Sequence, residues 1–241
     1  MIRGIIFDIN GTLIDILTDE YDYTVWRTTA NFLDYHGVRI DPDRLRACYT
    51  ELNRKQRKES PEKYPEFDVA SIFRTVISEF KTRPVKHPRL LADTASTLFR
   101  AASRRQLVPY PGVREVMDQL KGRFLLAAVS DGQVLWAYPE LRSLGLDQYF
   151  ASILISGDFG FRKPDVRLFE TVLDQLDLAA DEAVFVGNDM FRDIYGAHEA
   201  GMKTVFFKSN QGDWKPHGAE PDYIIYSFGE LPRAIEYFQG R

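Results

Sequence analysis

Residues 5–13 read Ile5-Ile6-Phe7-Asp8-Ile9-Asn10-Gly11-Thr12-Leu13, and this stretch decides how the rest of the chain is organised. An apolar run that ends in a carboxylate and a Gly-Thr turn is typical of a buried parallel strand that delivers one reactive group to the edge of a sheet. We therefore expect Asp8 to lie at that edge, and we place the later parts of the sequence relative to it.

The composition favours a small-molecule partner. Apolar residues make up 44% and charged residues 27% of the 241 residues, which is ordinary for a globular protein with a sizeable core. The 31 Lys and Arg residues nearly balance the 35 Asp and Glu residues, so the net charge of -4 provides no general attraction to nucleic acid or to an anionic membrane. We expect no nucleic acid and no membrane among the partners.

The cysteine content and the N-terminus predict a cytoplasmic protein. Cys48 is the only cysteine, which excludes an intrachain disulfide framework and suits a reducing compartment. The N-terminus lacks the charged and apolar regions of a signal peptide. No segment approaches the roughly 18 apolar residues that a membrane span needs.

Residues 17–108 have the pattern of an all-helical insertion. Four stretches repeat apolar residues at helical spacing, and no convincing strand separates them. Gly37 ends the first stretch, and Asp41-Pro42 starts the second with an N-cap followed by a proline. Four amphipathic helices can pack together as a small bundle, so we expect a four-helix domain here. The third stretch has the strongest period, through Val69, Ile72, Phe73, Val76, Ile77 and Phe80.

From residue 109 onward, helical and strand patterns alternate, which predicts βα units and a mainly parallel sheet. We assign residues 1–16 and 109–241 to a three-layer, Rossmann-like α/β core domain, and residues 17–108 to the inserted helical domain. Most of the expected strands are short continuous apolar runs, as in strands covered on both faces. After the first strand they span residues 124–129, 152–155, 183–186, 204–207 and 223–225, with helices expected at 113–121, 166–176 and 193–200.

Polar residues follow the expected strands at the points where ligands bind in open parallel α/β sheets. Any one of these groups alone has an ordinary explanation as a turn or a helix start. Together they supply a nucleophilic carboxylate, a hydroxyl, an ammonium group and further acids, which is the equipment for metal-assisted phosphoryl transfer. In chain order the groups are Asp8 and Asn10; Ser130-Asp131-Gly132; Arg162-Lys163-Pro164; and Gly187-Asn188-Asp189 with Asp193.

These four groups, in this order, resemble the four motifs of the haloacid dehalogenase (HAD) superfamily. The helical insertion after the first motif is similar to the helical cap of its phosphoglycolate-phosphatase-like and nucleotidase-like branches. The resemblance covers the whole chain and implies a phosphoric monoester hydrolase that acts on a small phosphorylated metabolite. The motifs read Phe-Asp-Ile-Asn-Gly-Thr-Leu (7–13), Val-Ser-Asp-Gly (129–132), Gly-Phe-Arg-Lys-Pro-Asp (160–165) and Val-Gly-Asn-Asp-Met-Phe-Arg-Asp-Ile-Tyr-Gly-Ala (186–197).

The resemblance implies catalytic and substrate-binding roles. Asp8 would attack phosphorus and become an aspartyl phosphate. Ser130, Asp131 and Lys163 would bind the substrate, and Ser130 would hold a phosphoryl oxygen. Lys163 would balance the negative charge of Asp8 and of the phosphate. This charge balance has a physical reason, because a carboxylate is a poor nucleophile toward a phosphate dianion unless a cation offsets their repulsion.

The resemblance also implies Mg²⁺, held by Asp8, by the backbone carbonyl of Asn10 and by the fourth motif. That motif departs from the commonest pattern, because Asn188 stands where an aspartate usually follows the glycine, and Asp189 comes next. We expect Asn188 and Asp189 to share the ligand role, and Asp193 to order a metal-bound water from outside. With one carboxylate fewer, Mg²⁺ should bind more weakly than in the usual site.

Asn10 is the residue that does not fit. In phosphatases of the resembled family this position is a second aspartate, which protonates the leaving group and then activates the hydrolytic water. An amide cannot exchange a proton near neutral pH, so a contribution of about 10² to 10⁴ in rate should be lost. Asn10 should keep only the backbone contact to the metal.

Three explanations of Asn10 remain open. We favour a phosphatase with weak or unusual turnover; the protein could instead be an impaired enzyme that binds a phosphorylated ligand. Dehalogenase-type chemistry at carbon is less favoured. The family's dehalogenases have tyrosine at this position and its phosphonate hydrolases have alanine, and asparagine matches neither. An engineered substitution is conceivable, although Asp8 is intact. We expect a monomer or homodimer whose cap closes on hinges near residues 17–23 and 108–111.

Overall fold

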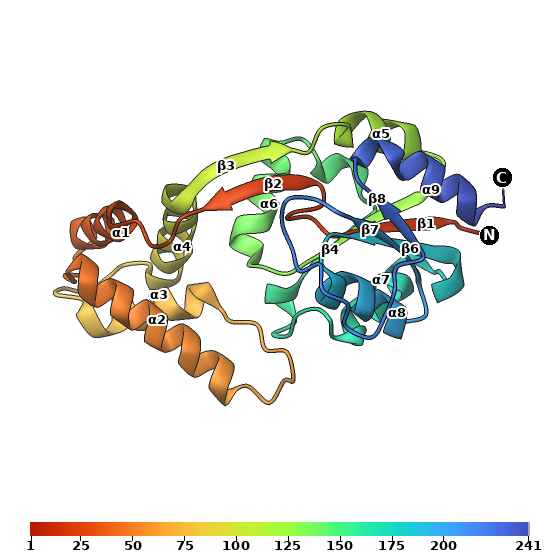
Figure 1. Ribbon diagram of the computed structural model, residues 1–241. Helices are drawn as coiled ribbons and strands as arrows, with labels where there is room; N and C mark the ends of the chain where they lie inside the picture. Colours follow the sequence, from red (N-terminus) through yellow and green to blue (C-terminus); the bar gives the residue numbers. More distant parts are fainter. Residues whose placement is uncertain (241) are drawn as a thin grey trace.

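The structure is a computed structural model that describes residues 1–240. It has two parts, an α/β core and a helical insertion, joined by a long two-stranded ribbon (Figure 1). The core holds one six-stranded sheet in which every neighbouring pair is parallel, with β1 at its centre. The expected α/β class is confirmed. In spatial order the strands are β5 (Ser152–Ile155), β4 (Leu125–Ser130), β1 (Gly4–Phe7), β6 (Ala183–Gly187), β7 (Lys203–Phe207) and β8 (Tyr223–Ile225).

Helices cover both faces of the sheet, which explains why its strands read as continuous apolar runs. Along β1, Ile5 and Phe7 pack into one hydrophobic cluster and Ile6 packs into the other, because alternate side chains point to opposite faces. The first cluster contains residues of α5 (Val113–Leu120), α6 (Val134–Ser143) and α9 (Leu231–Phe238); the second contains residues of α7 (Val166–Leu176) and α8 (Gly196–Glu199).

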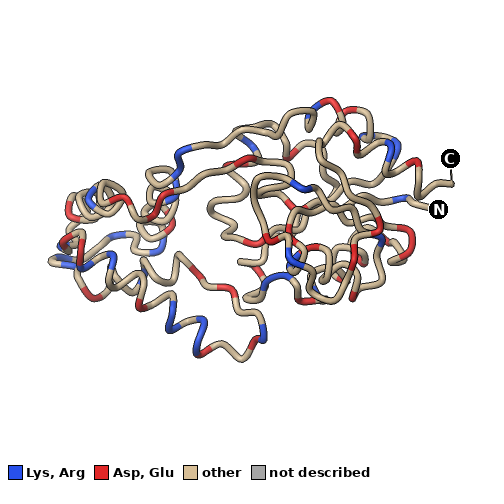
Figure 2. Tube along the Cα trace, in the orientation of Figure 1, with Lys and Arg blue, Asp and Glu red and all other residues tan. Residues whose placement is uncertain are grey.

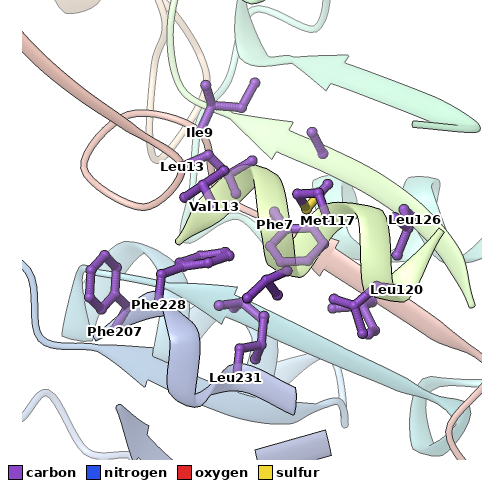
Figure 3. Close-up of a cluster of buried hydrophobic side chains, with 14 of the residues drawn as sticks. Phe7, Ile9, Leu13, Val113, Met117, Leu120, Leu126, Phe207, Phe228 and Leu231 are labelled. Atoms are coloured by element: carbon purple, nitrogen blue, oxygen red, sulfur yellow. The ribbon is translucent and has the colours of Figure 1, made fainter. Parts of the chain in front are cut away.

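Phe7 anchors the first of these clusters directly before the candidate nucleophile. Its ring is fully buried and lies 6.2 Å from the ring of Phe228, centroid to centroid, among the side chains of Figure 3. Replacing such a side chain by alanine costs about 3–5 kcal/mol in typical cores. The position of the residue after Phe7 is therefore set by a rigid environment.

The helical insertion contains the four expected helices, which pack around a hydrophobic core of their own. Three of them begin at an aspartate whose side chain accepts a backbone N–H: Asp22, Asp41 and Asp68. No helix within residues 1–240 combines the length and the apolar character needed to cross a membrane. The helices are α1 (Tyr23–Tyr35), α2 (Pro42–Glu59), α3 (Val69–Phe80) and α4 (Pro88–Ser103).

The ribbon between the two parts was not expected. Strands β2 (Ile14–Thr18) and β3 (Arg104–Pro109) pair antiparallel, where the sequence had suggested only flexible connections. The predicted domain boundaries at residues 17 and 108 fall inside this ribbon. Half-exposed strands lack the continuous apolar run that marks the strands of the main sheet, and this is why the pattern did not reveal them.

The insertion also rests on the core through α4 and α6. Arg100 of α4 and Glu140 of α6 form a partly buried ion pair at 2.6 Å, and the Arg100 guanidinium lies over the ring of Trp136. Trp136 belongs to the hydrophobic cluster of the insertion although it lies on a core helix, and its indole N–H donates to the carbonyl of Ser96. The insertion is thus fastened to the core at a second place besides the ribbon.

Candidate active site

Asp8 lies at the carboxyl end of the central strand, as expected. Its backbone N–H continues the pairing of β1 with β6 by donating to the carbonyl of Val186. Its buried carboxylate has two different partners: Oδ1 accepts from Lys163 Nζ at 2.6 Å, and Oδ2 accepts from the hydroxyl of Thr12 at 3.0 Å. Both carboxylate oxygens are therefore oriented before any substrate arrives.

The turn after Asp8 depends on Gly11. Its φ of 88° lies in the left-handed region, and a side chain there would come within 2.2 Å of Asn188 Nδ2. This close approach lets the hydroxyl of Thr12 lie between two groups, 3.0 Å from Asp8 Oδ2 and 3.2 Å from Asn188 Oδ1. The first and fourth motifs therefore meet at Thr12.

Lys163 is the centre of a buried charge network. Its ammonium group donates to Asp8 Oδ1 at 2.6 Å, to Asp193 Oδ1 at 2.7 Å and to the carbonyl of Val129 at 3.1 Å, so all three N–H groups have partners. Burial alone would lower the pKa of Lys163, but the charges of Asp193 and Asp8 outweigh burial and raise that pKa above its ordinary value. Lys163 is charged and fixed in place.

Asp193 holds the backbone of the other fourth-motif residues in place. Its Oδ2 accepts from the backbone N–H groups of Asn188 and Asp189, each at 3.0 Å. Burial raises the pKa of the Asp193 carboxyl to about 7, while the charge of Lys163 acts in the opposite direction. The lysine and the two backbone donors favour the ionised form. The expected water-ordering role of Asp193 stays a prediction.

Asn188 and Asp189 are neighbours that face different surroundings. Asn188 points toward Thr12 and Asp8, and its amide N–H donates to Ser209 Oγ at 3.4 Å. Asp189 caps the following turn, where its Oδ1 accepts from the backbone of Phe191 and Arg192. Its Oδ2 accepts from the Arg192 guanidinium at 2.9 and 2.8 Å. Burial acts to raise the pKa of Asp189, but the bonds from Arg192 bring the pKa below its ordinary value.

The second motif brings a free hydroxyl to the site. Ser130 is buried, and its hydroxyl has only a long contact of 3.5 Å to the carbonyl of Asp131. Asp131 faces the third motif instead: its carboxylate accepts from the backbone N–H of Lys163 at 2.9 Å and from Arg162 at 3.3 Å. Ser130 is thus free to bind an anion, whereas Asp131 ties two motifs together, and its predicted contact with substrate is untested.

Asn10 has a polar atom without a partner. Its side-chain Oδ1 is buried and accepts no hydrogen bond from the part of the chain that the structure describes. Leaving a buried acceptor unpaired costs about 1–3 kcal/mol, so such an atom signals a functional position. An amide oxygen can accept a hydrogen bond here, but it cannot deliver a proton.

The oxygens near Asp8 fit a hard divalent cation. The Asp8 carboxylate and the Asn188 amide oxygen lie on either side of the Thr12 hydroxyl, and oxygen donors of this kind suit Mg²⁺. The predicted ligation by the backbone carbonyl of Asn10 stays a prediction. Among residues 1–240, no three His, Cys, Asp or Glu side chains gather into a metal-binding cluster, so a cation here would meet mostly neutral ligands. Ligation by Asp189 would require its bonds to Arg192 to be exchanged.

The structure is thus a parallel α/β protein with a buried, lysine-paired aspartate at the end of its central strand. The sequence model of the haloacid dehalogenase-like hydrolases matches residues 5–207, and this chain belongs to that family. The resemblance of the four motifs is thereby confirmed.

Curated relatives include phosphatases that match along most of the chain. Glyceraldehyde 3-phosphate phosphatase of Pyrococcus furiosus is 28% identical over 241 residues, which cover 99% of this chain and 93% of the relative. The enzyme of the same name from Methanocaldococcus jannaschii is 26% identical and covers 96% of both chains. Phosphoglycolate phosphatase of Agrobacterium fabrum is 31% identical over 58% of this chain and 60% of its own length.

Solved structures show the same fold. A 2-haloacid dehalogenase from Pseudomonas syringae has a TM-score of 0.73 at 23% identity and covers 99% of this chain and 100% of its own. The HAD-hydrolase YfnB of Bacillus subtilis, bound to magnesium, has a TM-score of 0.59 at 22% identity and covers 98% of this chain and 99% of its own. At such identities the likeness concerns the fold alone.

Several residues of the site were missed in the sequence. Thr12 and Arg192 lie inside the motifs, and their hydroxyl and guanidinium were visible signals that spacing alone did not connect to Asp8 or Asp189. Ser209, two residues after the end of β7, was given no role from the sequence, yet it contacts Asn188. Glu66 and Ser156 had no signal, because 90 residues separate these hydrogen-bonded partners.

Proposed function

We propose that this protein is a Mg²⁺-dependent phosphatase that acts on a small phosphorylated metabolite through an aspartyl phosphate on Asp8. The observation that carries the proposal is the contact of 2.6 Å between Lys163 Nζ and Asp8 Oδ1, buried at the end of the central strand. A carboxylate held against a fixed ammonium group can approach a phosphate dianion with less electrostatic repulsion.

The proposed attack uses groups that are already oriented. An oxygen of Asp8 forms a bond to phosphorus while the bond from phosphorus to the alcohol oxygen breaks, and the alcohol oxygen leaves with that electron pair. Lys163 offsets the negative charge on Asp8 and on the phosphoryl group, and the free hydroxyl of Ser130 donates to a phosphoryl oxygen. Water then cleaves the aspartyl phosphate, which releases phosphate and regenerates Asp8.

Mg²⁺ would be held by Asp8, by the backbone carbonyl of Asn10 and by Asn188. When bound, it would supply positive charge at the phosphoryl group that is transferred. The predicted participation of Asp189 ranks behind that of Asn188, because Arg192 engages its carboxylate. Thr12 links Asp8 to Asn188, so this hydroxyl would hold two of the ligands in register.

Asn10 makes the proposed reaction slow to finish. The leaving oxygen finds no carboxylic acid at this position, and the water that cleaves the intermediate finds no carboxylate to take its proton. The missing general acid and base corresponds to about 10² to 10⁴ in rate. We therefore propose weak turnover, with good leaving groups favoured over poor ones.

The relatives support a short phosphorylated substrate. Those matched over most of the chain are named for glyceraldehyde 3-phosphate, and the one from Agrobacterium fabrum for phosphoglycolate. We propose that the helical insertion acts as a cap that encloses such a substrate and excludes water. We further propose that the protein works in the cytoplasm as a monomer or homodimer.

The test is hydrolysis of p-nitrophenyl phosphate with Mg²⁺ by the protein, by Asn10→Asp and by the matched control Asn10→Ala. A carboxylic acid restored at residue 10 should raise kcat by about 10² to 10⁴, whereas alanine should leave it low. Equal rates in the protein and in Asn10→Asp would contradict the role assigned to this position.

A second function is favoured by the two amides at the site. Asn10 and Asn188 both stand where carboxylates would serve catalysis, which suits a protein that binds a phosphorylated ligand without turning it over. Binding of inorganic phosphate with no hydrolysis by either the protein or Asn10→Asp would support the binder. Release of halide from a 2-haloacid without Mg²⁺ would exclude both phosphate functions.

A further inference from the structure

Residues 60–68, which join α2 to α3, leave the insertion and run against the core (Figure 1). We call them the docking segment. The carbonyl of Tyr64 accepts from the backbone N–H of Arg162 at 2.9 Å, and the backbone N–H of Glu66 donates to the carbonyl of Gly160 at 2.9 Å. The docking segment thereby pairs antiparallel with the residues directly before Lys163.

Glu66 is a buried carboxylate with no part in the proposed reaction. The residue is only 8% exposed. In Figure 2 the Asp and Glu residues, in red, are scattered along the tube in both the insertion and the core. Its Oε2 accepts from the hydroxyl of Ser156 at 2.8 Å, and its Oε1 accepts from the backbone N–H of Phe67 at 3.0 Å. Arg57 lies 3.5 Å away as a longer ion pair. A buried charge with such specific partners needs a reason.

Ser156 connects Glu66 to the second motif by hydrogen bonds. Its hydroxyl oxygen accepts from the backbone N–H of Gly132 at 2.9 Å, two residues after Ser130. A hydroxyl has only one proton, and here Glu66 is the charged acceptor for it, so the chain runs from Gly132 N–H through Ser156 to Glu66. The carbonyl of Gly132 is held as well, because it accepts from the N–H of Gly157 at 3.0 Å.

The neighbouring residue provides a second tie to the same loop. The side chain of Gln133 donates to the carbonyl of Phe67 at 2.6 Å and accepts from the backbone N–H of Val69 at 3.0 Å. Gln133 is buried and follows Gly132 directly. Gly132, through Ser156, and Gln133, directly, are thus both linked to the docking segment or to the first residue of α3; we call residues 130–133 the Ser130 loop.

We propose that Glu66 is a positioning residue through which the docked insertion sets the backbone of the Ser130 loop for phosphoryl binding. In this proposal the insertion does more than cover the substrate. Its docking segment also fixes the backbone at Gly132, because Glu66 holds the Ser156 hydroxyl to which the Gly132 N–H donates. The proposal rests on the proposed phosphatase function for its kinetic consequences, but the ordering of the loop stands on the hydrogen bonds alone.

The test compares Glu66→Ala, Glu66→Gln and Ser156→Ala. The matched control is Glu62→Ala, which removes another carboxylate of the docking segment whose ion pair with Arg167 leads to α7 instead of the loop. Amide hydrogen exchange at residues 130–133 reports loop order without any turnover. Steady-state kinetics with p-nitrophenyl phosphate and binding of inorganic phosphate report its consequence for the site.

Glu66→Ala and Ser156→Ala should each speed exchange at residues 130–133 about tenfold or more, and each should lower kcat/KM and phosphate affinity by about 10- to 100-fold. Their combination should be little worse than either alone, because both break one chain of contacts. Glu66→Gln should retain most of the function, since its carbonyl still accepts from Ser156. The control Glu62→Ala should stay within about twofold of the unmodified protein.

Unchanged exchange and unchanged phosphate affinity in a folded Glu66→Ala protein would overturn the inference, and so would additive losses in the double variant. If the unmodified protein and Asn10→Asp hydrolyse no phosphate ester, the proposed function fails, while the exchange measurement still decides the role of Glu66. Glu66→Gln keeps the question decidable if Glu66→Ala does not fold.

Discussion

The two sides of Asp8 differ in charge and in how completely their polar groups are hydrogen-bonded. On one side, Lys163 donates to Asp8, to Asp193 and to a backbone carbonyl, so its charged group is fully hydrogen-bonded. On the other side, Asn10 and Asn188 present neutral amides, and the side-chain oxygen of Asn10 is buried without a partner among residues 1–240. In the proposed reaction, the first side supports attack on phosphorus, and the second lacks a group for the proton transfer that completes hydrolysis.

Family membership and the proposed turnover therefore depend on different residues. The fold, the nucleophile and the counter-charge require Asp8, Lys163 and Asp193, and all three are present. In the proposed reaction, the speed of turnover depends instead on proton transfer at residue 10. Substitutions on one side of Asp8 at a time can therefore separate the two contributions.

The largest effect is expected from the nucleophile. Asp8→Asn should reduce hydrolysis of p-nitrophenyl phosphate by about 10⁴-fold or more, because Asp8 is the proposed nucleophile. Steady-state kinetics measures the loss, and Asp15→Asn, which changes a carboxylate that accepts from Gln211 nearby, is the control. Retained turnover in Asp8→Asn would move the chemistry to another residue.

A smaller loss is expected when the counter-charge is removed. Lys163→Met leaves two buried carboxylates facing each other, so kcat should fall by about 10²- to 10³-fold. The free energy of unfolding should also fall, by about 3–5 kcal/mol, because a buried ion pair has lost one partner. Kinetics and urea denaturation measure the two effects separately. A variant with unchanged stability would show that the network is not as buried as the structure has it.

The smallest effect concerns the metal. Asn188→Asp should strengthen Mg²⁺ binding about tenfold by adding a carboxylate beside Asp8, whereas Asp189→Asn should weaken it by less than about threefold. Calorimetric titration with Mg²⁺ measures both affinities. If Asp189→Asn abolishes binding, Asp189 is the main ligand, and a submicromolar affinity of the unmodified protein would contradict the weak site expected here.

The strands of the main sheet could be predicted from the sequence because both of their faces are buried. The runs ending at Phe7, Val129 and Val186 are continuous and apolar, and three of the four motifs that meet at the site follow them directly. The helices of the insertion were visible for a similar reason, since their apolar stripes recur at helical spacing. These patterns are local, so one sequence suffices to reveal them.

What could not be predicted depends on contacts between distant segments. The ribbon strands β2 and β3 are half exposed and pair across roughly ninety residues, so neither has a strong pattern of its own. Asn188 and Asp189 are adjacent in sequence, and only the bonds from Arg192 and Thr12 show which of them faces Asp8. The contact of Glu66 with Ser156 likewise exists only in the folded chain.

The most direct test of the central claim is the time course of p-nitrophenolate release when concentrated protein is mixed with p-nitrophenyl phosphate and Mg²⁺. This leaving group needs no proton, so Asp8 can be phosphorylated quickly even though Asn10 cannot help water to cleave the intermediate. We predict a rapid burst of p-nitrophenolate that approaches one equivalent per active site and is followed by slow release. In Asn10→Asp we predict faster steady-state release with a smaller burst. Release that is linear from the first turnover, at the same rate in both proteins, would contradict it.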